Sequence, residues 1–172
     1  MSAACAGATA AIAFAICLHI GWSISTPGYW LFSVLGVGLT YVDLRRRRLP
    51  HLVIGTIWAI CAILFTAESV YRHQVGDLAE AVISGLAVSA ALMLIALAAP
   101  GQLGLGDVHL AGTVAFTLGW LEWKSAAMAI AVALTFQWVW TVITVVRTRH
   151  RGVALPLGPA LFGAWVIAII FQ

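Results

Sequence analysis

The sequence predicts an all-α integral membrane protein: a polytopic bundle of about seven transmembrane helices that forms a single domain over residues 1–172. Three observations support this fold class. Hydrophobic residues make up 63% of the chain and charged residues only 9%, against roughly 25% charged in soluble domains. The mean hydropathy is +1.04. Long apolar tracts alternate with short polar or glycine- and proline-containing connections, which is typical of a chain that crosses a membrane repeatedly.

Turn-forming and charged residues delimit the apolar tracts. The helices are expected at about 3–22, 29–44, 50–67, 78–99, 107–119, 125–146 and 155–172. No Lys or Arg precedes the first tract, so it lacks the basic region of a cleaved signal peptide and should be retained. Tyr29 and Trp30 are typical interfacial anchors at the start of the second helix. Pro50 suits the first turn of the third. A polar connection over 68–77 should precede the fourth, and Pro100 should end it.

The basic residues orient this bundle. Seven of the nine Lys and Arg residues lie within 45–48 and 147–151, directly after the second and sixth helices. The positive-inside rule places both runs, and the loop at 100–106, in the cytoplasm. The expected location is therefore the inner (cytoplasmic) membrane, with the N-terminus cytoplasmic and the C-terminus outside. Because this topology explains the positive charges, they do not indicate binding to nucleic acid.

Two aspartates stand out against this apolar background. Asp107 is the only Asp, Glu, Lys or Arg in the 41 residues of 81–121, and an ionisable group at membrane depth suggests a functional site. Asp43 has similar surroundings at the end of the second helix. Counting 14 helical steps of ~1.5 Å from Asp107 to Leu121, and again from Tyr29 to Asp43, gives about 21 Å in each case. Both carboxylates should therefore lie at one depth, just beneath the cytoplasmic surface.

Two carboxylates at one depth in a low-dielectric site share a proton and titrate as a pair. Such a pair permits aspartic-protease chemistry, in which one member activates a water and the other polarises a carbonyl. Gly101, Gly104 and Gly106 would let a substrate backbone approach and let the loop move. Two structural roles remain open: Asp107 as a helix cap and Asp43 as a partner of the adjacent arginines.

Three segments resemble a known family. The run Asp43-Leu-Arg-Arg-Arg-Arg-Leu-Pro50 resembles the first aspartate motif of type IV prepilin peptidases, in which Pro follows Asp by seven residues. Gly104-Leu-Gly-Asp107-Val-His-Leu110 is similar to their Gly-x-Gly-Asp-x-Lys-Leu motif. Leu155-Pro-Leu-Gly-Pro159 is similar to the stretch that opens the family's last helix.

The resemblance implies a membrane aspartic endopeptidase, a short form of the family without the cytoplasmic methyltransferase and zinc domain. Its implied substrate is a prepilin or pseudopilin with a basic leader and an apolar helix, which it cleaves at the cytoplasmic face of the lipid bilayer. By motif position Asp43 and Asp107 are the catalytic pair. Cofactors and metals are not implied, and neither is N-methylation. His109 and His51 depart from the family's usual Lys and Asn/Asp.

Two alternatives come from other classes. A small transporter or channel could use a protonatable aspartate pair, but a transport pathway would also need polar groups across the rest of the membrane. A structural pilus-assembly subunit would have dispensable acids. The spacing also predicts that His109, two residues after Asp107 and about 200° around the helix, points away from the partner acid. Glu68 and Asp77 are expected in an outer loop, where their substitution should leave activity unchanged.

Overall fold

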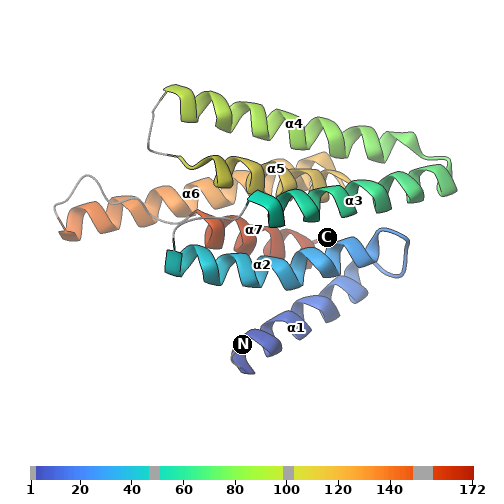
Figure 1. Cartoon of the computed structure of the whole chain (residues 1–172), viewed down its shortest axis with the longest axis horizontal. Helices are drawn as coiled ribbons and strands as arrows, with labels where there is room; N and C mark the ends of the chain where they lie inside the picture. Colours follow the sequence, from blue (N-terminus) through green and yellow to red (C-terminus); the bar gives the residue numbers. More distant parts are fainter. Residues whose placement is uncertain (1–2, 47–50, 99–102, 149–156) are drawn as a thin grey trace.

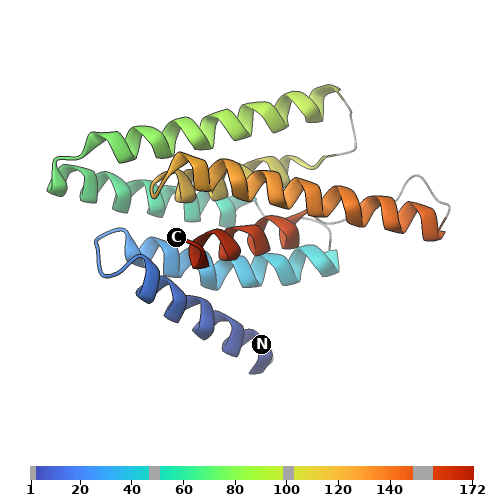
Figure 2. The same cartoon turned by 180° about the vertical axis from the view of Figure 1, so that it is seen from behind.

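The computed structural model describes residues 3–46, 51–98, 103–148 and 157–172, and these residues form seven helices (Figure 1). The helices are α1 (Ala3–His19), α2 (Thr26–Arg46), α3 (His51–Arg72), α4 (Val75–Ala98), α5 (Leu105–Gly119), α6 (Trp123–Thr148) and α7 (Gly158–Ile170). The expectation of an all-helical bundle is confirmed. Successive helices run back and forth along the long axis, so the end of α2 and the starts of α5 and α7 lie at the same end of the molecule (Figures 1 and 2).

Within the described residues, three helices are long and apolar enough to cross a membrane: Leu52–Arg72, Val75–Ala98 and Trp123–Arg147 within α3, α4 and α6. The apolar stretches Thr9–His19 in α1 and Gly158–Ile170 in α7 are shorter. Large apolar side chains are exposed along the three long helices, among them Leu94, Trp138 and Val146. This is the surface expected of helices that contact lipid.

The core is built on the two short helices, α5 and α7. Almost every residue of α5 from Val108 onward is buried, and α7 buries eight of its 13 residues. α5 contacts α3, α4, α6 and α7, while α7 also contacts α1, α2 and α6. A helix surrounded by protein is apolar on all sides, which explains why neither has a distinct polar face.

Thr117 ties α2 and α7 to α5. The Tyr29 hydroxyl in α2 donates to the Thr117 carbonyl oxygen at 2.7 Å, and the Trp165 indole N–H in α7 donates to the Thr117 hydroxyl at 3.0 Å. Gly36 allows α2 to approach α7, because a Cβ there would collide with the Phe162 ring. These contacts fix the three helices whose ends carry the candidate site.

Two expectations from the sequence are wrong. Tyr29 is fully buried, so it is a core residue and not an interfacial anchor. The polar connection expected over 68–77 is also much shorter, because α3 continues to Arg72 and α4 begins at Val75. Glu68 therefore lies inside α3 and is only 2% exposed, whereas Asp77 is exposed in the first turn of α4.

Candidate active site

Asp43 lies in the last turn of α2 and is only 4% exposed. Its Oδ2 accepts a hydrogen bond from the backbone N–H of Gly158, the first residue of α7, at 3.0 Å. The bond joins residues 115 positions apart in the sequence. A buried carboxylate needs such donors, since burial without them carries a large desolvation penalty.

Asp107 lies in the first turn of α5 and is partly exposed. Its backbone N–H donates to the Gly104 carbonyl oxygen at 3.0 Å, which starts the helix. A Cβ on Gly104 would lie 3.2 Å from Asp107 Oδ2, closer than ordinary van der Waals contact. The Gly104 backbone is extended, with φ −78° and ψ 142°, so no unusual backbone angle requires glycine here, and a side chain would require the Asp107 carboxylate to shift by a few tenths of an ångström.

The structure brings the two aspartates together. The Asp43 and Asp107 carboxylates are close enough for their charges to repel one another. Because each negative charge disfavours ionisation of the other, such a pair can hold one proton between them. One buried and one partly exposed carboxyl group, at one end of the bundle, form an arrangement that can activate a water molecule.

Comparison with protein-family models gives a match that includes the two aspartates. The model of the type IV leader peptidase family matches residues 29–146, which is more than half of the chain and includes both aspartates. The chain belongs to the type IV leader peptidase family. The comparison with curated proteins found no match, and the comparison with solved structures found none either. Family membership makes this leader peptidase homologue a peptidase, a hydrolase of peptide bonds, and its apolar helices indicate a membrane protein.

The three glycines expected to form a loop differ in position. Gly101 lies outside the described residues. Gly104 is the residue that precedes α5, as a loop glycine should. The prediction that Gly106 lies in the loop is wrong, because α5 begins at Leu105 and Gly106 is helical. The Val108 N–H donates to the Gly104 carbonyl oxygen, a helical hydrogen bond that makes Gly106 part of the first turn of α5.

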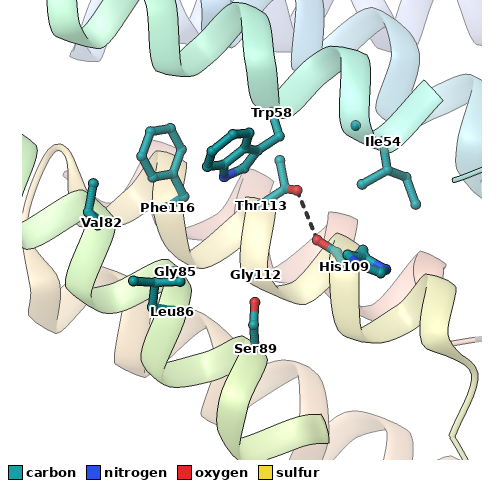
Figure 3. Close-up of a pocket in the computed structure, with 11 residues that line it drawn as sticks. Ile54, Trp58, Val82, Gly85, Leu86, Ser89, His109, Gly112, Thr113 and Phe116 are labelled. Atoms are coloured by element: carbon teal, nitrogen blue, oxygen red, sulfur yellow. Dashed lines mark hydrogen bonds between the residues drawn. The ribbon is translucent and has the colours of Figure 1, made fainter. Parts of the chain in front are cut away.

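His109 points away from the aspartates, as its position two residues after Asp107 predicts. It lines a cavity of about 550 Å³ between α3, α4 and α5, together with Trp58, Ser89 and Phe116 (Figure 3). Its Nδ1 lies 2.9 Å from the Leu105 carbonyl oxygen, one turn back along α5. Neither aspartate lines this cavity. His109 therefore belongs to the opposite face of α5 from the carboxylate pair.

Sequence reasoning misses the contact between Gly158 and Asp43. The motif Leu155-Pro-Leu-Gly-Pro159 is recognisable in the sequence, but it assigns no role to its glycine. A Gly-Pro pair at the start of a helix is the available indication, because Pro suits a first turn and Gly leaves space for a neighbour. Nothing in the sequence says which neighbour uses that space.

No cluster of three His, Cys, Asp or Glu residues occurs in the part of the chain that the structure describes. Cys61 is buried, and its thiol lies 3.7 Å from the Gly28 carbonyl oxygen. It packs between α2 and α3, as a small core residue does.

Proposed function

We propose that this leader peptidase homologue is an aspartic endopeptidase that removes the basic leader of prepilin- or pseudopilin-like substrates. The observation that carries the proposal is the proximity of Asp43 and Asp107, which come from different helices and lie in a largely buried site. An isolated helix cap would not need a second carboxylate beside it. The transporter alternative receives no support from a family of peptidases.

The proposed reaction uses one water molecule and no covalent intermediate. The ionised aspartate accepts a proton from the water, and the water oxygen bonds to the scissile carbonyl carbon. The protonated aspartate donates its proton to the carbonyl oxygen, forming a gem-diol. On collapse of the gem-diol the C–N bond breaks: the aspartate that took the proton from water donates it to the leaving nitrogen, and the other aspartate accepts a proton from a gem-diol hydroxyl, which leaves a carboxyl product. The pair thereby returns to its starting state with one proton between the two groups.

The proposed substrate has a Lys/Arg-rich leader, Gly before the cleavage point and a following apolar helix. Purified protein in liposomes should cleave a synthetic peptide of this design after the Gly, and mass spectrometry would identify both products. A matched peptide with a charged residue in place of the Gly should resist cleavage. Cleavage of both peptides at unrelated sites, or of neither, would contradict this substrate assignment.

The proposed location is the inner membrane, with the aspartate pair near the cytoplasmic face. In intact cells, cysteines introduced at Gln102 and Arg149 should resist an impermeant thiol reagent, whereas those at Gln74 and Gln172 should react. The Gln172 side-chain amide donates a hydrogen bond of 2.7 Å to the Ser125 hydroxyl near the start of α6. If the cysteine at position 102 reacts and the cysteine at position 74 does not, the topology is the reverse of the one proposed, and the aspartate pair faces the outside.

A further inference from the structure

The N-terminus of α7 is capped from outside its own helix. The first N–H groups of any helix have no acceptor within it. Leu157, which precedes α7, has no polar side chain, and Pro159 has no N–H. Asp43 supplies an acceptor from α2 through the 3.0 Å bond to the Gly158 N–H. The positive end of the α7 dipole therefore faces a carboxylate, an arrangement that stabilises negative charge.

Gly158 also has a steric reason to be glycine. A Cβ at this position would lie 2.6 Å from Asp43 Oδ2, 3.3 Å from its Cγ and 3.4 Å from its Cβ. The first of these separations is shorter than real Cβ contacts, so the carboxylate would have to move. Asp43 is 4% exposed and has little room to do so. Any side chain at position 158 would displace the carboxylate from the N–H that binds it.

The two aspartates are therefore held differently. Asp43 is buried and accepts an N–H from a separate helix, whereas the backbone donor near the Asp107 carboxylate is Gly104, only three residues earlier, and Asp107 keeps contact with solvent. Burial disfavours the ionised form of Asp43, and the hydrogen bond from Gly158 acts in the opposite direction by favouring it. With Oδ2 engaged by Gly158, Oδ1 is left to accept a proton from water.

We infer that Gly158 is a positioning residue that holds Asp43 as the ionised base of the pair, which leaves Asp107 to carry the proton. This inference rests on the proposed hydrolytic function. In this assignment Asp43 accepts the proton from the water, and Asp107 donates its proton to the carbonyl oxygen of the substrate. In this role Gly158 acts through the Asp43 carboxylate that its N–H binds.

The test compares Gly158→Ala with Gly163→Ala, a change in the same helix where nothing lies within 4 Å of the new Cβ. For Gly158→Ala we expect kcat to fall by about 10- to 100-fold, the value of one charged hydrogen bond, with KM nearly unchanged. The acidic limb of its pH–activity profile should move to higher pH, because the base loses the donor that favours its ionised form. Gly163→Ala should match the parent in all three measurements.

A second variant separates the N–H from the added bulk. Replacing the Gly158 N–H with an ester oxygen, through an α-hydroxy acid at this position, removes the donor and adds no side chain. The acidic limb of its pH–activity profile should move to higher pH, as in Gly158→Ala. The ester variant therefore still tests the inference if Gly158→Ala does not fold. Parental pH profiles in the folded variants, or a change in KM alone, would overturn the role of Gly158. If Asp43→Asn is inactive at the same time, the proposed function stands without this inference, whereas an active Asp43→Asn variant removes the function itself.

Discussion

Asp43→Asn and Asp107→Asn should each reduce cleavage of a co-expressed prepilin by roughly three orders of magnitude or more, and the double mutant should be no worse than either single change. Groups that act as one unit lose nearly all their effect when either is removed, so their substitutions are strongly non-additive. Folding should survive, because a neutral amide costs less to bury than a carboxylate. In the Asp43→Asn variant, the new amide oxygen could still accept the Gly158 N–H.

Processing in membranes, read as a mobility shift of the pilin, measures this effect, with protein level and heat stability determined for each variant. The matched control is Asp77→Asn, since Asp77 is an exposed aspartate in the first turn of α4, and α4 starts at the other end of the molecule from the start of α5 (Figure 1). Substantial cleavage by either folded Asp→Asn variant would refute the aspartic mechanism. Loss in both, with Asp77→Asn unaffected, would leave a shared catalytic water as the simplest account.

Glu68→Ala should lower the free energy of unfolding by about 2–3 kcal/mol, the value of a hydrogen bond to a charged group together with a buried N–H left unpaired. Glu68 Oε2 accepts the Ser25 N–H at 2.7 Å, and Oε1 pairs with Arg72 Nε at 2.8 Å. The side chain is 3% exposed, and Ser25 is buried as well. Glu68 thus binds the connection between α1 and α2 to the end of α3.

Thermal unfolding in detergent measures this change, with Glu122→Ala as the matched control. Glu122 pairs with Lys124 at 3.5 Å, but both side chains are more than half exposed, so their pair should add little stability. Equal melting temperatures for Glu68→Ala and the parent would contradict the structural role assigned here. The prediction that Glu68 lies in an exposed loop is wrong, because it took the residue's charge as a sign of exposure. That its substitution leaves activity unchanged stays a prediction.

Several features could be predicted from the sequence because they depend on local chemistry. Apolar tracts of helical length predict the helices, and charged or turn-forming residues predict where most of them end. An aspartate alone in a 41-residue tract indicates a site, since a charge there is costly to bury. The spacing of Asp107 and His109 alone predicts that they occupy different faces of α5, because each helical residue turns the chain by about 100°.

Only the tertiary structure decided which polar side chains are buried. Tyr29 has the aromatic character of an interfacial residue, and Glu68 has the charge of a loop residue. Both are buried because partners far away in the sequence satisfy their polar atoms: Thr117 for Tyr29, and Ser25 for Glu68, which also pairs with Arg72 one turn along its own helix. A single sequence carries no record of such partners, since they lie up to 88 positions away.

The same division applies to the candidate site. The sequence by itself determined the helical membrane class, the family resemblance and the two aspartates, because each depends on residue type and short-range spacing. Only the tertiary structure decided that the Asp43 carboxylate meets the N-terminus of α7 and that Gly158 must lack a side chain to allow it. That contact joins residues 115 positions apart, and its existence depends on how α2 and α7 pack together, which no local pattern encodes.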